Sequence, residues 1–418
     1  MEFKINLYLV IILTILIGGY LLDVLVEYLN IRNLKTGLPE EFKGVYDPQR
    51  YETSQKYLKE NTIFGIFQDT FFLLIIIFFI FSASFDIVDK FARSYGLGSI
   101  LTGLIFAFTL LLGFQLLKIP FSAYHTFIIE EKYGFNKTTI KTFITDILKG
   151  WILGGFIGGI VFAGIIWFFA VFGKFAWFYF WISFSIFELF LTFIAPVLIM
   201  PLFNKFIPLE DGDLKRSVED YAQKENFKIK GLFKMDGSRR STKSNAFFTG
   251  FGKFRRIVLF DTLIQKHTTD ELVSVLAHEM GHYKKKHILK SIILSFLESA
   301  LMFFILSLFI NNTGLAKAFK MEYVSIYSSI IFFGFIYSPL NLILSIFGNW
   351  FSRKNEYEAD RYAAETYKKP DAMINALKKL TVDNLGNLTP HPVKVFMEYT
   401  HPPILKRISA SRQLNLTP

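Results

Sequence analysis

The chain has 418 residues, 52% of them hydrophobic, and its many long apolar runs exclude an ordinary soluble protein. It contains no cysteine, which excludes disulfides and cysteine-ligated metals, so any metal site must use His, Asp or Glu. The net charge of +11 is typical of cytoplasmic loops that face anionic lipid, and we expect no nucleic-acid partner.

The apolar runs predict seven transmembrane helices, because each approaches or exceeds the roughly 20 residues that cross a bilayer. In chain order they are Leu7–Tyr28, Ile63–Phe81, Ile100–Leu117, Trp151–Phe172, Trp177–Ile199, Ile288–Ile310 and Val324–Phe347. Only Lys4 precedes the first run, without a small-residue cleavage site after it, so we interpret this run as a retained span. The loops after the first and third spans are the most basic. Their alternation with poorly charged loops predicts an outside N-terminus and an inside C-terminus.

Two polar segments, 203–287 and 350–418, lie on the cytoplasmic side in this topology. In the first, LKRSVEDYAQKENF has helical periodicity, and RRIVLFDTLI predicts a short strand followed by a turn. In the second we expect helices around Lys354–Tyr367 and Pro370–Leu380. The chain thus divides into 1–202 with five spans, an insertion at 203–287, two further spans at 288–349 and a C-terminal part at 350–418.

Five acidic residues fall inside the apolar runs, where each costs a few kcal/mol or more unless it faces a partner, water or the bundle interior. Asp23, Glu27 and Asp69 are equally compatible with positions near the membrane surface. Glu188 and Glu298 lie near mid-span. They therefore predict a polar cavity within the bundle.

His278, Glu279 and His282 form an H-E-x-x-H motif. On a helix, residues four apart share one face, so two imidazoles can bind one zinc ion while the glutamate serves as general base toward a water. The flanking VLAHEMG is typical of a buried helix, and we expect Gly281 to leave room beside the metal. The alternative is an incidental histidine pair on a membrane-surface helix.

A catalytic zinc site needs a third protein ligand, and NEYEAD offers three acids. Glu356 and Asp360 are four apart and share a helix face, whereas Glu358 points away. We therefore predict Glu356 as the ligand and Asp360 as the acceptor that orients a ligand imidazole. Taken alone, this pattern is equally typical of a solvated acidic helix.

The sequence resembles the type I CAAX prenyl proteases, integral-membrane zinc proteases of the gluzincin kind, over nearly its whole length. The segments that carry the resemblance are YHTFIIEEKYGFNKTT (Tyr124–Thr139), MPLFNKFIPLEDGDL (Met200–Leu214), DGSRRSTKSNAFFTGFGKFRRIVLFDTL (Asp236–Leu263), HEMGHYKKKH, SRKNEYEAD and YTHPPILKRI (Tyr399–Ile408). Shorter heat-shock membrane proteases share the zinc motif but have fewer spans. The resemblance implies a predominantly α-helical membrane protein whose seven spans enclose a chamber. It also implies a cytosolic metalloprotease domain with a small β-sheet.

The same resemblance implies one zinc ion per chain, bound by His278, His282 and Glu356. Glu279 would be the base of a hydrolytic reaction.

Further matching positions imply roles around this centre. Asn245 and Ala246 match a segment beside the substrate, where an edge strand can pair with an extended peptide. His401 matches a histidine that stabilises the oxyanion, and Arg407 matches an arginine near the site that could bind a substrate carboxylate or backbone oxygen. Without the resemblance we would interpret His401 as a loop residue and Arg407 as a lipid anchor. His287 also matches, but its spacing of five from His282 predicts a non-catalytic position.

The implied activity is endoproteolysis that removes the C-terminal tripeptide from prenylated proteins or peptides ending in Cys-a-a-X. The Phe-, Ile- and Lys-rich composition is compatible with a bacterial source, and most bacteria lack prenylation. A quality-control protease acting on membrane-tethered chains is therefore an alternative. A seven-span transporter or receptor with a structural zinc is a second. The membrane would be the inner membrane in a bacterium or the endoplasmic reticulum in a eukaryote, with the site facing the cytoplasm.

Overall fold

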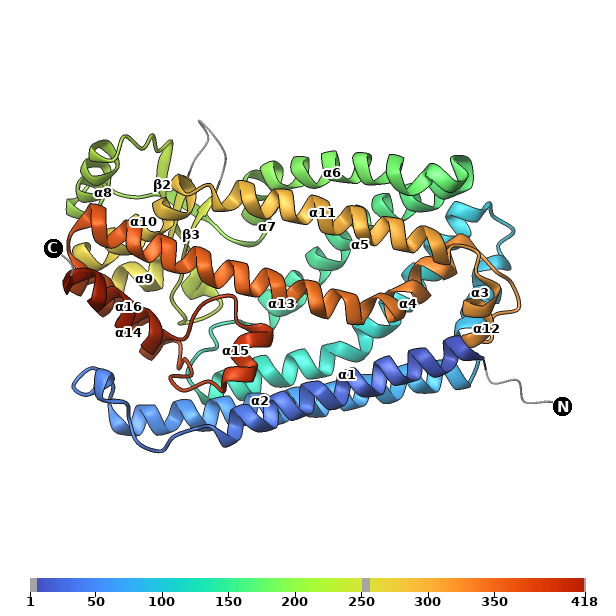
Figure 1. Cartoon of the computed structure of the whole chain (residues 1–418), viewed down its shortest axis with the longest axis horizontal. Helices are drawn as coiled ribbons and strands as arrows, with labels where there is room; N and C mark the ends of the chain where they lie inside the picture. The colour runs from blue at the N-terminus through green and yellow to red at the C-terminus, as the bar shows by residue number, and fades with distance from the viewer. Residues whose placement is uncertain (1–5, 250–255, 417–418) are drawn as a thin grey trace.

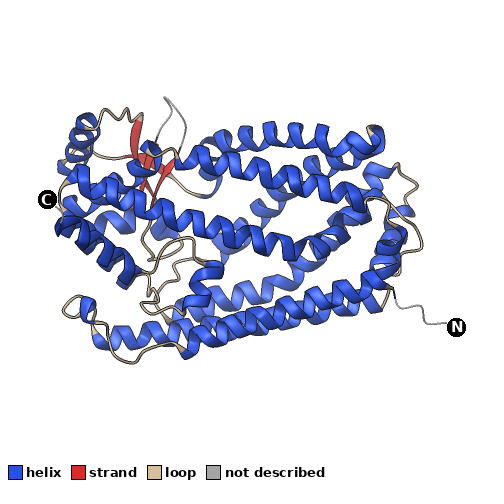
Figure 2. Ribbon diagram, viewed as in Figure 1, coloured by secondary structure: helices blue, strands red, loops and turns tan. Residues whose placement is uncertain are grey.

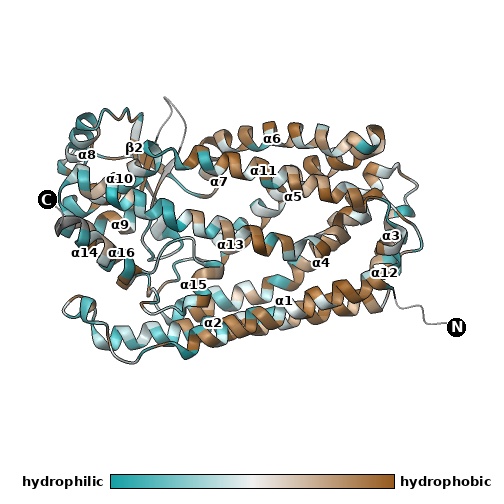
Figure 3. Cartoon of the chain, viewed as in Figure 1, coloured by the Kyte–Doolittle hydropathy of each residue, from teal (hydrophilic) through white to brown (hydrophobic). Residues whose placement is uncertain are grey.

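The computed structural model describes residues 6–249 and 256–416. Within these ranges seven helices are long and apolar enough to cross a membrane, which confirms the predicted number of spans. They are α1 (Leu7–Arg32), α2 (Pro48–Phe81), α4 (Ser99–Tyr124), α5 (Ile140–Val171), α6 (Ala176–Ile194), α11 (His287–Phe309) and α13 (Ile326–Tyr367). These helices follow the long axis of the molecule, and the termini lie at opposite ends (Figure 1). Hydrophobic residues dominate their middle lengths (Figure 3).

Helix α13 is longer than its apolar run predicts. It continues without a break to Tyr367, so the predicted helix around Lys354–Tyr367 is the cytoplasmic extension of the last span rather than a separate element. The expected boundary between residues 349 and 350 falls inside this helix. Because one rigid helix joins the membrane part to the polar end, residues near its C-terminus are held at a fixed position relative to the bundle.

The polar insertion contains a four-stranded sheet in the order β1-β2-β4-β3. Its strands are β1 (Phe206–Pro208), β2 (Gly231–Met235), β3 (Ala246–Thr249) and β4 (Arg256–Phe260). The central β2 and β4 pair in parallel, and the outer strands pair antiparallel to them. The predicted strand in RRIVLFDTLI is therefore confirmed as β4. The predicted turn after it is wrong, because Asp261 begins a short helix, α9 (Asp261–Lys266), in which its carboxylate accepts the N–H of Thr262.

The sheet lies at one end of the long helices, together with most of the polar helices (Figures 1 and 2). These are α8 (Asp213–Lys224), which confirms the helix predicted from LKRSVEDYAQKENF, α10 (Thr269–Lys284), α14 (Pro370–Asp383) and α16 (Ile404–Leu416). Helix α14 begins with Pro370, as predicted. Val218, Leu259, Leu276 and Met280 form one buried core with Ala363 of α13. This end of the molecule therefore has its own hydrophobic core, which α13 helps to build.

The remaining short elements connect the long helices. They are η1 (Glu40–Phe42), α3 (Ser84–Arg93), the π-helical η2 (His125–Glu130) and η4 (Ala195–Ile199), η3 (Gly173–Phe175), α7 (Met200–Phe203), η5 (Gly237–Arg239), α12 (Thr313–Ala318) and α15 (Pro392–Glu398). Single π-helical turns are frequent at functional sites, and η2 continues α4 directly.

A polar cavity of about 550 Å³ lies between α1, α2 and α15. Its lining includes Asp23, Glu27 and Asp69, the three acids that were equally compatible with the membrane surface. Lys394 also lines it and places its Nζ 2.6 Å from Glu27 Oε1. The mid-span Glu188 instead accepts a hydrogen bond of 2.6 Å from the Ser295 hydroxyl on the neighbouring span.

Candidate active site

The start of α10 is fixed by a capping box. The Thr268 hydroxyl accepts the N–H of Glu271 at 3.3 Å, and the Glu271 carboxylate accepts the N–H of Thr268 at 2.9 Å. Nearly every following residue up to Gly281 is buried. A capped and buried helix holds its side chains in fixed rotamers, which a metal site requires.

Helix α13 passes very close to α10 at Gly281. A Cβ atom at this position would lie 3.0 Å from Ala359 Cα and 3.1 Å from the Ala359 carbonyl oxygen. The glycine therefore leaves room for the backbone of α13, rather than directly for the metal as the sequence suggested. This close approach brings the acidic end of α13 against the histidine pair of α10.

The three predicted ligands converge. The Nε2 atoms of His278 and His282 are 3.1 Å apart, and the Glu356 carboxylate lies 3.2 Å from His282 Nε2 and 3.5 Å from His278 Nε2. Their ligand atoms all lie within 4.8 Å of one another, and His278 and Glu356 are buried. Two imidazoles and one carboxylate are the donor set of catalytic zinc sites with an open fourth position. The residues present therefore fit a divalent metal.

Asp360 lies beside the other ring nitrogen of His278. Its Oδ1 lies 2.8 Å from His278 Nδ1. Burial by itself would lower the pKa of His278, but the contacts with Asp360 and Glu356 outweigh it and raise that pKa to about 9. The pocket therefore favours positive charge at the imidazole, which a bound metal cation would supply in place of a proton. A proton on Nδ1 facing Asp360 would direct the Nε2 lone pair toward the cation.

Arg407 lies behind the ligands. Its Nε and Nη2 donate to the two Asp360 oxygens at 2.8 and 2.6 Å, and its Nη1 is 3.4 Å from Glu356 Oε2. Burial opposes the charged form, but the neighbouring Asp360 raises the pKa of Arg407 above its ordinary value. The buried guanidinium is paired with the carboxylate that faces His278, which favours a positioning role for Arg407 over the expected contact with substrate.

His401 lies at the mouth of the site. Its side chain is 63% exposed, and its Nδ1 is 2.8 Å from Glu356 Oε2. Arg353 of α13 holds the preceding loop by donating to the carbonyl oxygens of Tyr399 and Val395 at 2.5 and 3.0 Å. Glu279 is half-buried beside the first histidine. The exposed His401 is therefore open to a group that enters the site.

The sequence reasoning missed two residues of this centre. His287 Nδ1 lies 3.0 Å from His282 Nδ1, and its Nε2 lies 3.1 Å from Glu358. The expectation for His287 assumed that the helix of His282 continues unbroken, whereas Glu358 lies on the continuous α13 and contacts His287. Helix α10 ends at Lys284, and Lys286 adopts a left-handed conformation with φ of 59°, which turns the chain and returns His287 to His282. In the sequence, the match of His287 to the family was the only feature that pointed to this contact.

The proposed substrate segment lies at the edge of the sheet. Strand β3 is the last strand in the order, and Ala246 pairs with Leu259 of β4 on its inner side. Asn245 is exposed, and its backbone carbonyl oxygen accepts a hydrogen bond of 3.1 Å from the N–H of Phe260. Strand β3 also contacts α10. Within the described residues, its outer side has no neighbouring strand, so an extended peptide could pair there beside the histidine helix.

Comparisons with known proteins agree with this architecture. A family model described as CAAX prenyl protease N-terminal, five membrane helices, matches residues 27–205, and one described as peptidase family M48 matches residues 208–415. The chain is 35% identical to a probable CAAX prenyl protease 1 of Schizosaccharomyces pombe, covering 94% of this chain and 86% of that protein. The CAAX prenyl protease 1 homolog of Homo sapiens is 31% identical, with coverage of 91% and 89%.

A solved structure is similar over almost the whole molecule. The crystal structure of S. mikatae Ste24p superposes with a TM-score of 0.92 at 31% identity, covering 97% of this chain and 99% of that one. The chain therefore belongs to the CAAX prenyl protease family within peptidase family M48, and it is a multi-pass integral-membrane metalloprotease.

Proposed function

We propose that this protein is a zinc-dependent endopeptidase that removes the C-terminal tripeptide from prenylated proteins or peptides ending in Cys-a-a-X. The observation that carries the proposal is the convergence of His278, His282 and Glu356 within 4.8 Å beside the free edge of β3. The printed names of the relatives supply the substrate class. When bound, zinc supplies a Lewis acid that polarises a carbonyl and makes water a better nucleophile.

The chain's own residues would carry the proton transfers. The Glu279 carboxylate takes a proton from the attacking water and returns it to the leaving amine. His401, exposed at the mouth, donates a hydrogen bond to the carbonyl oxygen as negative charge develops there. Asp360 and Arg407 act indirectly, by fixing the orientation of His278 and Glu356.

Substrate would bind in two parts. Ala246 begins the edge strand that would align the peptide by backbone hydrogen bonds, and Asn245 immediately precedes it. The prenyl chain would occupy the membrane part of the molecule, close to the polar end where the metal ligands lie. The basic loops after the first and third spans support a cytoplasmic position for this end. The site would therefore face the cytoplasm in the endoplasmic reticulum of a eukaryote or the inner membrane of a bacterium.

The test is cleavage of a farnesylated Cys-a-a-X peptide by the purified full-length protein. We expect one zinc per chain, loss of cleavage with a chelator and recovery with zinc. Glu279→Gln should keep the zinc and lose turnover by about 10²- to 10⁴-fold, the range for a general base. Glu365→Gln is the matched control, because Glu365 is exposed on α13 and distant in sequence from the motif.

Two outcomes would contradict the proposal. Equal cleavage by wild type and Glu279→Gln would remove Glu279 from the chemistry. Cleavage of a non-prenylated, membrane-tethered chain together with no cleavage of the farnesylated peptide would favour a quality-control protease instead.

A further inference from the structure

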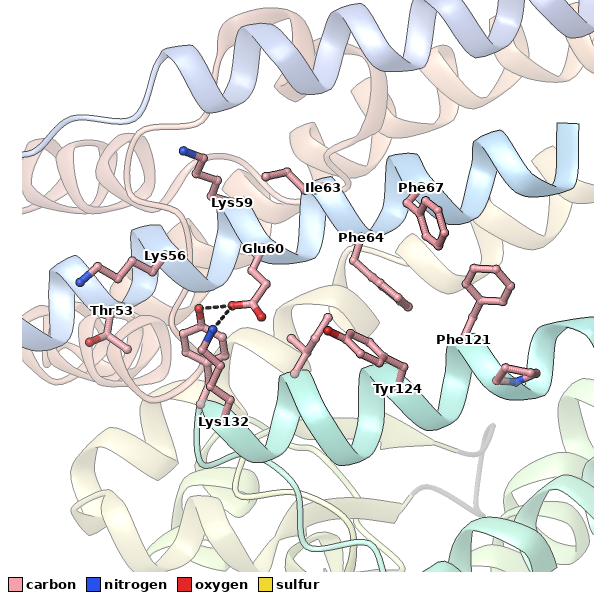
Figure 4. Close-up of a pocket in the computed structure, with 13 residues that line it drawn as sticks. Thr53, Lys56, Lys59, Glu60, Ile63, Phe64, Phe67, Phe121, Tyr124 and Lys132 are labelled. Atoms are coloured by element: carbon pink, nitrogen blue, oxygen red, sulfur yellow. Dashed lines mark hydrogen bonds and ion pairs between the residues drawn. The ribbon is translucent and has the colours of Figure 1, made fainter. Parts of the chain in front are cut away.

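A second cavity, separate from the metal ligands, lies between α2 and the continuous α4–η2 segment. It has a volume of about 930 Å³, at the upper end of the range for ligand pockets. Its floor is aromatic. Figure 4 shows Phe64 and Phe67 of α2 projecting toward Tyr124 and Phe121 of α4. The ring centroids of Phe64 and Tyr124 are 5.3 Å apart and nearly parallel.

The cavity and the polar cavity described above lie on different faces of α2. Residues Asn61, Thr62 and Asp69 of α2 line the polar cavity beside α1, whereas Phe64 and Phe67 line this groove. Residues on opposite faces of one helix point in opposite directions, so the groove lies on the far side of α2 from the polar cavity. Phe67, on the apolar part of α2, is 62% exposed, so the aromatic end of the groove is open to a ligand.

Lysines lie at one end of the groove. Lys56 and Lys59 are within two helical turns of Ile63, where the apolar run of α2 begins, so their ammonium groups reach the level of lipid headgroups. Lys132 contributes from the other wall, just after η2. Figure 4 shows these lysines at the end of the groove opposite Phe67 and Phe121. The groove is thus amphipathic along its length.

The acidic group in the groove is already neutralised. The Glu60 carboxylate accepts a hydrogen bond of 2.7 Å from Lys132 Nζ and one of 2.6 Å from the Tyr133 hydroxyl. Lys59 has no ion-pair partner among the described residues. Lys56 pairs with Glu52, but both side chains are about two-thirds exposed (68% and 67%), and such pairs contribute little. Two ammonium groups are therefore available to an incoming anion.

We propose that this groove is a binding site for one anionic phospholipid of the surrounding bilayer. Its phosphate lies between Lys56 and Lys59, and an acyl chain lies over Phe64, Phe67 and Phe121. The ligand is a lipid rather than a soluble phosphate, because a soluble anion would leave the aromatic floor unused. The site is independent of the proposed peptidase reaction.

The test is native mass spectrometry of the full-length protein titrated with phosphatidylglycerol or phosphatidylcholine carrying identical acyl chains. We expect the first phosphatidylglycerol to bind more tightly than the first phosphatidylcholine. Replacing Lys56 and Lys59 by glutamine should weaken the phosphatidylglycerol step by about fivefold per lysine removed and leave phosphatidylcholine unchanged. Phe67→Ala should weaken both lipids.

The matched control is Lys35→Gln with Lys141→Gln, which removes the same charge from exposed positions outside the groove. This pair should leave phosphatidylglycerol binding unchanged. Equal affinity of the wild type for the two lipids, or equal weakening by the control pair, would overturn the proposal. Displacement of the lipid by millimolar inorganic phosphate would also overturn it, because the site would then be one for soluble anions.

Discussion

His287 begins α11 with its Nδ1 only 3.0 Å from Nδ1 of His282, and it contacts Glu358 through its other nitrogen. Both contacts are satisfied if each histidine carries one proton. His282 then donates from Nδ1 to His287, and His287 donates from Nε2 to Glu358. This arrangement leaves His282 Nε2 free to bind the metal. Glu358 and His287 would therefore orient the second histidine as Asp360 orients the first.

We expect His287→Ala and Glu358→Ala each to lower zinc affinity by about 10- to 100-fold, as for other residues that orient a metal ligand. The measurement is a competition titration with a chromogenic chelator. His125→Ala is the control, since His125 bonds Asn61 through Nε2 and belongs to a different part of the chain. Unchanged zinc affinity in both variants would show that the hydrogen bonds linking His282, His287 and Glu358 do not affect metal binding.

The spans and the histidine pair could be predicted because their signals are local. A long apolar run or an i,i+4 pair needs no knowledge of distant contacts. The continuity of α13 was harder to see. The first part of this helix is apolar and its last part is charged, so the sequence pattern predicts a span followed by a separate helix.

The role of Arg407 and the position of His287 depend on tertiary structure. The sequence placed Arg407 near the site, but only the fold shows that its Nε and Nη2 both donate to Asp360. The left-handed Lys286 is a single backbone conformation in a lysine run, where no glycine or asparagine marks the turn. The spacing of five residues therefore did not reveal the contact between His287 and His282.

Arg407 offers a direct test of positioning against substrate binding. Arg407→Met would leave the buried Asp360 without its cation, which typically costs about 3–5 kcal/mol in the free energy of unfolding. We expect a lower thermal midpoint and weaker zinc binding. Arg407→Lys should recover part of the thermal midpoint and part of the zinc affinity. A lysine keeps the charge but loses the bidentate contact with Asp360.

A different result would contradict the positioning role of Arg407. If zinc affinity and the thermal midpoint stay at wild-type values while KM for the peptide rises, Arg407 binds substrate after all.

Gly281→Ala tests the close approach of α10 and α13. The added methyl group would lie 3.0 Å from Ala359 Cα, and a backbone atom cannot move as a side chain can. We expect a loss of roughly 1–3 kcal/mol in the free energy of unfolding and a displaced Glu356. Thermal midpoint and zinc affinity should therefore fall together. Gly348→Ala on α13, where the new Cβ meets nothing within 4 Å, should leave both unchanged or slightly raised.

His267 makes stability depend on pH independently of the metal. It is buried, its Nδ1 lies 3.2 Å from the Leu263 carbonyl oxygen, and its Nε2 has no hydrogen-bond partner among the described residues. Burial lowers the pKa of His267 below its ordinary value of about 6.5. The unfolded chain then binds this proton more readily than the folded one. Stability is therefore lost as pH falls below that ordinary value and toward the lowered one.

His267→Asn keeps a donor at the Nδ1 position and removes the titrating group. We expect the thermal midpoint of the wild type to fall more steeply than that of the variant between about pH 6.5 and 5, with the two proteins converging in slope above neutrality. Zinc affinity measured at neutral pH should be equal in both, because His267 follows α9, precedes α10 and is not among the converging ligands. Parallel midpoint curves across this range would show that His267 is not protonated on unfolding.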